Sequence, residues 1–531
     1  MRQNIRSGNL KTKERVKSKM SRATLCKLSI IYMYLPIALM IVGWCSFWFF
    51  IPATQILVWV VFNTLEKQQS KESITFKKWE ILLGLVLLIL AVYYSGWGGL
   101  VPQSSDWPKH NAVLRDLMVR TWPVIYHNHD MVSMLTYYLG QYIVPAAVGK
   151  LLLLLFPQAI TLETAFVVSE VVMALWNMIG LALVICHLFH LVGHGSFKIL
   201  VMAAFLLFGN PLVLGKLLYM GMGFSSDLNN YHWLTYDYLM AQYSTNFVLM
   251  RWTFPQCIVP WIVMAMLMEG DNDVDSYVVI GLPVILFATF PFLAIVIYMI
   301  VLAVKKFLSQ NDKKAFLLKC FSKENLLCFL SLGTFSFCYY ISYFLTKEKP
   351  ESLKLSFVFS WSRQFLVTYG VFVVFTFGLY AILLLKYEKK NLFLNSSIVI
   401  LLVLPLFQFG VWNDFVMRVS IPSLFVICVL TLKRIFEASF KHKGYKLALL
   451  AVYLCGMYYP VRELTDVVRQ DTIILWQEPF DSYYTLELFA NPKARELDEY
   501  LSGYGDDVIW NYFTYDAKDS FFLKTIGKKI P

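Results

Sequence analysis

The sequence predicts an all-α protein that crosses a membrane many times, and three observations lead to this fold class. The chain has 531 residues, of which 58% are hydrophobic and only 15% are charged, whereas a soluble domain is about half apolar and about a quarter charged. Many windows of roughly 20 residues are nearly free of charge, which is long enough for a helix to cross the hydrocarbon core. Backbone groups in lipid must be satisfied within the segment and these runs are too long for barrel strands, so the spans are helical.

About 13 spans are expected along the chain. The first two runs are expected to form a hairpin around Trp48 to Pro52, and the runs on either side of Pro291 are expected to form two short helices. The expected spans are 28–48, 49–65, 79–98, 164–190, 197–218, 246–268, 277–290, 291–304, 325–346, 366–386, 392–412, 415–435 and 446–460.

Lysine and arginine set the expected orientation, because they gather in cytoplasmic loops. The N-terminus is densely basic, and so are the linkers EKQQSKESITFKKW, KKFLSQNDKKAFLLKCFSK, KYEKK and KRIFEASFKHKGYK. A cytoplasmic N-terminus places all four linkers inside, provided that 132–156 does not cross completely. Pro145, Gly149 and Lys150 suit a re-entrant or interface-lying helix there. The net charge of +12 is then accounted for by the inner loops and is not a sign of nucleic-acid binding.

This arrangement predicts a multi-pass protein of the cell membrane whose chain has three parts. Residues 1–27 form a basic cytoplasmic N-terminus, residues 28–460 a multi-span domain, and residues 461–531 a small extracytoplasmic appendage. The first large external loop, 99–163, is expected to be partly helical. The nine cysteines lie in or beside apolar segments and none has CxxC spacing, so neither a disulfide framework nor a metal site is expected.

The stretch SSDWPKHNAVLRDL in this loop reads as a helix start. Ser105 or Asp106 is placed to cap the helix, with Pro108 in its first turn. If a helix follows, Asp106 and His110 are four residues apart and share one face, and Arg115 lies further along it.

The same stretch has two chemical interpretations. An anionic headgroup would meet Lys109, His110 and the positive helix end at the membrane boundary, and a carboxylate at Asp106 could act there as a general base. In the alternative interpretation, Asp106 only caps the helix and Lys109 only contacts lipid phosphates.

Two further stretches carry ionisable or polar groups near the same face. In GVWNDFVMRVSIP, Asp414 and Arg418 stand four apart at the outer end of a span, on the same face of the membrane as Asp106. The pair could belong to a site with Asp106, or it could be only a structural salt bridge or a snorkelling arginine. In QYSTNFVLMRWTFPQCIVPW, Arg251 and Gln256 interrupt an apolar run, where polar groups are costly. Arg251 could bind a phosphate through two hydrogen bonds, or it could simply reach the interface.

Glu170 is a secondary candidate. It lies near the outer end of its span and shares a helix face with Asn177. It could line a cavity or pair with Arg251, or the two polar side chains could only join packed helices.

A long polytopic chain with an acidic loop after an early span, outward Asp and Arg clusters and an extracytoplasmic tail resembles the GT-C glycosyltransferases, of bacterial type. These are integral membrane enzymes that use polyprenyl-phosphate sugars. The resemblance is architectural over most of the chain, and sharp only at SSDWPKHNAVLRDL and less so at WNDFVMRVSIP. It implies that Asp106 serves as base for the acceptor and that external cations hold the lipid phosphate. The substrate-binding candidates are Lys109, His110, Arg251, Gln256, Asp414 and Arg418, with Glu170 and Arg115 as secondary candidates.

The chain departs from the family pattern in three respects. It has no DxD or ExD at Asp106, which leaves a divalent cation open as a cofactor. The two N-terminal spans, ahead of the span that leads into the loop, are an extra feature, and the tail aligns with no family domain.

The expected function is transfer of a sugar from a polyprenyl-phosphate donor to a saccharide, lipid or protein acceptor. The alternative is a transporter or a flippase for lipid-linked sugars, which would use the same charges as a translocation path. Paired repeat halves are not detected, and the polar groups gather on one face, which favours the enzyme. A third interpretation is a non-catalytic scaffold that binds through its tail.

Overall fold

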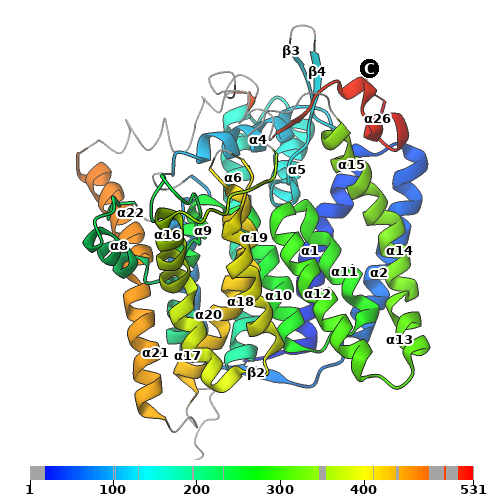
Figure 1. Cartoon of the computed structure of the whole chain (residues 1–531). Helices are drawn as coiled ribbons and strands as arrows, with labels where there is room; N and C mark the ends of the chain where they lie inside the picture. Colours follow the sequence, from blue (N-terminus) through cyan, green and yellow to red (C-terminus); the bar gives the residue numbers. More distant parts are fainter. Residues whose placement is uncertain are drawn as a thin grey trace, which may run out of the picture.

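The computed structural model describes residues 18–99, 101, 103–128, 131–193, 197–230, 232–345, 354–410, 412–437, 442–477, 496–497, 501 and 512–529. Within these ranges the chain is mostly helical and has three small sheets (Figure 1), as the composition predicts. The helices are α1 (Arg22–Trp44), α2 (Phe47–Lys67), α3 (Lys78–Tyr94), α4 (Trp107–Val119), α5 (Gly140–Leu155), α6 (Leu162–Val192), α7 (Lys198–Leu206), α8 (Leu212–Gly221), α9 (Asn246–Trp252), α10 (Ile258–Glu269), α11 (Tyr277–Gly281), α12 (Thr289–Ser309), α13 (Lys313–Cys320), α14 (Lys323–Cys328), α15 (Thr334–Leu345), α16 (Arg363–Val373), α17 (Leu379–Glu388), α18 (Leu392–Val403), α19 (Asp414–Val419), α20 (Ile421–Phe436), α21 (Lys443–Gly456), α22 (Tyr458–Gln477) and α26 (Phe521–Thr525). The strands are β1 (Ser18–Ser21), β2 (Ser73–Phe76), β3 (Ile125–Asn128), β4 (Met131–Leu135), β5 (Ser356–Phe357), β6 (Phe407–Gln408) and β7 (Phe513–Thr514).

Seven helical stretches in the described part of the chain are long and apolar enough to cross a membrane. They are Arg22–Trp44, Phe47–Lys67, Leu162–Val192, Thr289–Ser309, Lys313–Leu345, Arg363–Glu388 and Asp414–Phe436. Several shorter apolar helices accompany them, so the fold is compatible with membrane insertion. The number of about 13 spans stays a prediction.

Proline marks the points at which several expected spans are interrupted. Pro211 immediately precedes α8, Pro255 lies in the 3-10 turn between α9 and α10, and Pro405 lies in the turn that ends α18. Proline lacks the N–H that would continue a helix, and its ring clashes with the preceding turn. The expected spans that are interrupted in this way are 197–218, 246–268 and 392–412.

One end of the bundle collects the basic linkers, and we name it the basic end. β1 pairs with β2 there, and Lys67 forms ion pairs with Asp275 and Glu324, both at 3.1 Å. Lys306 pairs with Asp273 at 2.9 Å. Figure 1 shows β2, α13 and the linker ends of α17 and α21 at this same end. The four basic linkers therefore share one end of the bundle, which is the grouping that their charge predicts.

α4 and α5 lie at the end of the bundle opposite β2 (Figure 1), and we name this end the Asp106 end. The preceding strand β4 pairs with β7, and the same C-terminal segment reaches the end of α1 through a bridge between Cys45 and Gly527. Near its start, α5 places Gln141 against Asn177 of α6 and donates from Gln141 Nε2 to the Tyr32 hydroxyl at 2.9 Å. Tyr32 stands midway along α1. α5 thus begins beside the middle of α1, and whether 132–156 is re-entrant stays a prediction.

The last described segment, 512–529, packs on the Asp106 end. β7 extends the β3–β4 hairpin as a third strand, and the Phe522 ring meets Phe335 edge-on at 5.9 Å. Asp116 of α4 is completely buried and accepts hydrogen bonds from the Tyr126 hydroxyl at 2.8 Å and from the Leu497 backbone N–H at 3.0 Å. The end of the chain, expected as an appendage, is therefore bound to the helices in these described residues.

Replacing Asp116 by alanine should destabilise the fold, because it leaves buried donors without their acceptor. We expect a loss of about 3–5 kcal/mol in the free energy of unfolding, measured as a lower Tm in detergent and faster proteolysis near the C-terminus. Asp519→Ala is the matched control, since that side chain is 79% exposed and its loss should change stability by less than about 0.5 kcal/mol. An equal Tm for the two variants would show that Asp116 does not hold the tail.

Candidate functional site

A broken helix and two tryptophans fix the start of α4. α9 ends at Trp252, and the last carbonyls of a helix have no partner within it. Trp97 Nε1 donates to the Met250 carbonyl at 2.8 Å, and Trp107 Nε1 donates to the Arg251 carbonyl at 3.1 Å. Both indoles are buried. The loop that carries Asp106 is thereby fastened to the end of α9.

Asp106 occupies the N-cap position of α4 with Pro108 in the first turn, but its side chain makes no capping hydrogen bond. The carboxylate instead pairs with Lys109 Nζ at 2.7 Å, and its side chain is 39% exposed. Burial acts to raise the pKa of Asp106, but the charge and hydrogen bond of Lys109, with smaller contributions from His110 and Arg418, together outweigh it, so the pKa lies below its ordinary value. The group is an accessible carboxylate at neutral pH.

His110 lies one turn further on and is buried against α5. Its Nδ1 is 2.6 Å from the Tyr142 hydroxyl. Burial, and then the charge of Lys109, lower the pKa of His110 to about 3, so the imidazole is neutral at pH 7. His110 was expected as a phosphate-binding cation. In the structure it shapes the wall of the site, and the positive charge comes from Lys109 and Arg418.

The second predicted stretch joins the first. Asn413 adopts a left-handed conformation with φ of 49° and donates to the Met240 carbonyl at 2.6 Å, which fixes the turn before α19. Arg418 Nη2 pairs with Asp414 Oδ2 at 2.8 Å, and the charge of Arg418 contributes to lowering the pKa of Asp106. The structure therefore brings together Asp106, Lys109, His110, Asp414 and Arg418, which we name the Asp106 cluster.

A wall of tyrosines borders the Asp106 cluster. The Tyr137 and Tyr138 ring centroids are 3.6 Å apart, and Tyr137 stacks on Tyr512 at 4.6 Å. The Arg418 guanidinium lies 5.9 Å from the Tyr138 ring centroid. No pattern in the sequence singles out these residues, and Tyr512 comes from the tail, where no local pattern places it beside Tyr137.

Arg251 forms a separate buried ion pair. Its Nε is 2.9 Å from Glu463 Oε1, and both side chains are less than one-tenth exposed. Trp252 Nε1 donates to the same oxygen at 3.0 Å. The pairing of Arg251 with Glu170 that the sequence left open is therefore wrong, because the partner is on α22. Glu463 was missed, since nothing in the sequence places α22 beside α9.

Three other candidates make their described contacts outside the Asp106 cluster. Glu170 sits under the Gly96–Gly99 turn, so closely that a Cβ on Gly99 would approach Glu170 Oε1 to 2.8 Å. Gln256 is 1% exposed within the 3-10 turn after α9. Arg115 pairs with Asp116 at 3.0 Å and belongs to the contacts that hold the tail. In the part of the chain that the structure describes, no group of three or more His, Cys, Asp or Glu is placed to hold a metal ion.

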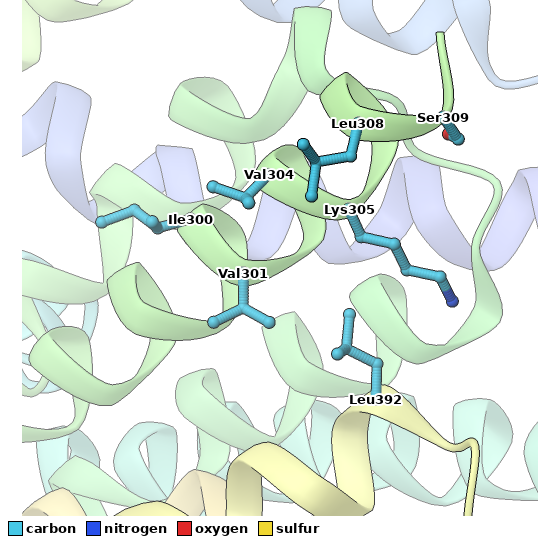
Figure 2. A pocket seen from close by; sticks show the side chains of 7 residues that line it. All are labelled: Ile300, Val301, Val304, Lys305, Leu308, Ser309 and Leu392. Carbon is cyan, nitrogen blue, oxygen red and sulfur yellow. The ribbon is translucent and has the colours of Figure 1, made fainter.

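Two apolar cavities lie outside the Asp106 cluster. A groove of about 600 Å³ lies between α12 and α18, and Lys305 is the one charged side chain in its lining. Figure 2 shows the side chains that line it: Ile300, Val301, Val304, Lys305, Leu308, Ser309 and Leu392. A smaller cavity of about 210 Å³ lies among α3, α7, α9 and α22 and is lined by Leu87, Leu90, Ala91, Tyr94, Ala203, Leu206, Leu207, Phe247, Leu464 and Val468. Both suit hydrocarbon and not a polar reaction.

The lowered pKa of His110 predicts a pH-dependent stability. An unfolded chain takes up a proton at His110 as the pH falls through about 6.5, whereas the folded chain does so only near 3. The stabilisation is therefore complete above pH 6.5 and is lost as the pH falls, at up to about 1.4 kcal/mol per unit. Between pH 7.5 and 5, the wild type should lose about 2 kcal/mol more stability than His110→Asn. Thermal unfolding in detergent measures this, with His127→Asn, at an exposed position, as control; parallel losses in wild type and His110→Asn would refute it.

The chain was compared with protein-family models, with curated proteins and with solved structures, and none of the three comparisons finds a match. Function is therefore inferred from the Asp106 cluster and the groups around it.

Proposed function

We propose that this chain is a membrane glycosyltransferase of GT-C type, which moves a sugar from a polyprenyl-phosphate donor to an acceptor. The observation that carries the proposal is the grouping of an accessible carboxylate with two cations at one end of an apolar bundle. Asp106 pairs with Lys109 at 2.7 Å, and Arg418 is close enough to lower the pKa of Asp106. A carboxylate can activate a hydroxyl, and fixed cations can hold a phosphate leaving group.

The donor would reach this cluster from the bilayer. A polyprenyl phosphate cannot leave the membrane, so its headgroup must be met at the interface. Arg418 keeps one buried nitrogen, Nε, that has no hydrogen-bond partner in the described part of the chain, and Lys109 is 21% exposed. The Lys109 ammonium and the Arg418 guanidinium can both turn toward a phosphate, whose oxygens accept strong charge-assisted hydrogen bonds from such cations.

Donor binding would also prepare the base. Without donor, Lys109 holds Asp106 ionised and weakly basic. A phosphate that pairs with Lys109 weakens this contact, and burial then raises the pKa of Asp106. The acceptor oxygen bonds to the anomeric carbon, the bond from that carbon to the phosphate oxygen breaks with its electrons passing to the phosphate, and Asp106 takes the acceptor proton.

The same proposal includes the orientation in a cell membrane. The basic end would face the cytoplasm, following the charge rule for loops. The Asp106 cluster would then face the extracytoplasmic side, where a saccharide, lipid or protein acceptor is met.

A flippase or transporter is the second candidate, and one observation favours it. Polar side chains lie deep in the bundle, where Gln141 of α5 contacts Asn177 of α6 and the Tyr32 hydroxyl. Gln141 Oε1 and Asn177 Nδ2 have no further partner within the described ranges. Such groups at mid-depth are what a translocation path requires.

Turnover of Asp106→Asn separates the two candidates. Purified protein is incubated with a panel of polyprenyl-phosphate sugars, and release of free polyprenyl phosphate is followed. Asparagine keeps the size of the side chain but cannot take a proton, so kcat should fall by about 10²- to 10⁴-fold. Asp237→Asn, which changes an exposed carboxylate of the loop before α9, should react like the wild type. Equal turnover in all three proteins would remove Asp106 as the base, and lipid binding without any turnover would favour the flippase.

Replacing Arg418 tests the phosphate site. Arg418→Gln removes the charge, while Asp414, left without its partner, is 42% exposed and can be hydrated. Affinity for sugar-free polyprenyl phosphate should fall roughly 10- to 100-fold, as the loss of a charge-assisted hydrogen bond implies. Arg363→Gln, at an exposed position, is the control, and unchanged binding by Arg418→Gln would place the phosphate elsewhere.

A further inference from the structure

Glu463 is a buried carboxylate that is only half satisfied. It is 2% exposed, and its Oε1 accepts from both Arg251 Nε and Trp252 Nε1. Its Oε2 is buried and has no hydrogen-bond partner in the part of the chain that the structure describes. Leaving a buried acceptor unpaired costs about 1–3 kcal/mol or more for a charged group. An oxygen held in place at such a cost points to a ligand that donates to it.

A row of aromatic rings leads outward from Glu463. Trp252, which donates to Glu463, meets the His232 ring edge-on at 5.3 Å. His232 lies 5.2 Å from Trp233, and Trp233 lies 6.0 Å from Trp412, whose side chain is 54% exposed. Trp233 Nε1 is a second buried polar atom without a partner in the described residues. Indoles offer an apolar face and one donor, which suits the mixed apolar and hydroxyl surface of a sugar ring.

The loop that contributes His232 and Trp233 is held down by two cations. Lys216 of α8 donates to the Asp227 carbonyl at 2.8 Å. Arg462, next to Glu463 on α22, donates to the Leu228 carbonyl at 3.1 Å. The fold therefore holds His232 and Trp233 next to Trp252, the indole that donates to Glu463.

This group borders the Asp106 cluster. The charge of Asp106 acts on His232, opposing the burial that lowers the His232 pKa to about 4. Trp107, the neighbour of Asp106, donates to the backbone of Arg251, whose side chain holds Glu463. A sugar placed against Glu463 would thus lie next to the proposed base and phosphate site.

We propose that Glu463, Trp252 and Trp233 form the subsite that recognises the sugar of the donor, with Glu463 Oε2 accepting a sugar hydroxyl and Trp233 Nε1 donating to one. Glu463 then determines specificity and takes no part in bond making. This inference rests on the proposed function, because the sugar that it locates is the sugar of the polyprenyl-phosphate donor.

Binding of lipids with and without a sugar tests the subsite. The probes are undecaprenyl phosphate and undecaprenyl-phosphate-linked glucose, galactose, mannose and arabinose, offered to the whole chain in lipid nanodiscs. Wild type should bind at least one sugar-bearing lipid about tenfold more tightly than undecaprenyl phosphate, the equivalent of about 1.4 kcal/mol. Glu463→Gln keeps the shape of the side chain and one oxygen to accept from Arg251. It replaces the other oxygen, the proposed acceptor of the sugar hydroxyl, by an NH2 group that cannot accept. It should lose most of this preference while its affinity for undecaprenyl phosphate stays within about twofold.

Two further variants keep the test decisive. Asp466→Asn lies on the same helix, has a side chain that is 43% exposed, and should keep the wild-type preference. Trp233→Phe removes the unpartnered N–H but keeps an aromatic ring, so it should reduce the preference even if Glu463→Gln proves unstable.

The outcomes separate this inference from the proposed function. A full sugar preference in both Glu463→Gln and Trp233→Phe, or its absence in the wild type, overturns the subsite. Turnover of a donor without any sugar preference would keep the transferase and reject the subsite, whereas preference without turnover would keep the subsite and reject the transferase.

Discussion

Two indole hydrogen bonds at the broken end of α9 hold the site together. A helix that stops inside an apolar bundle leaves carbonyls that must find donors, because an unpaired buried carbonyl is costly. Trp97 and Trp107 supply these donors to consecutive carbonyls. The same contacts set where α4 begins, and so where Asp106 lies. They also fix the backbone of Arg251, whose side chain forms the ion pair with Glu463. Both halves of the site depend on this one break in a helix.

Under the proposed function, the Asp106 cluster would accept an anion by exchanging the partners of its two cations. Each cation already has a carboxylate partner, Lys109 with Asp106 and Arg418 with Asp414. Both carboxylates are partly exposed, so a phosphate can share or replace them at modest cost. His110 adds no charge, because its burial against Tyr142 keeps it neutral at pH 7. Under the proposed function, the positive charge that meets a phosphate therefore comes from Lys109 and Arg418.

The sequence predicted the helical class, the shared end of the four basic linkers and the position of Asp106 at a helix start, because each follows from local composition. Its pairing of Asp106 with the Asp414–Arg418 stretch also agrees with the geometry, since the charge pattern places both near one end. It could not place Glu463 or Tyr512. Their roles arise where α22 meets α9 and where the tail meets α5, contacts between segments hundreds of residues apart. It left Arg251 open as a phosphate ligand, an arginine that reaches the interface or a partner of Glu170, since no local pattern shows a carboxylate arriving from α22. The interruptions of 197–218 and 246–268 were missed because apolar composition hides the effect of Pro211 and Pro255.

The most direct measurement is an electron cryo-microscopy structure of the whole chain in nanodiscs with polyprenyl phosphate bound. We expect a phosphate within hydrogen-bond distance of Lys109 and Arg418, with the lipid chain directed into the bilayer from the Asp106 end. A phosphate bound at the basic end, or deep in the bundle beside Gln141 and Asn177, would contradict it.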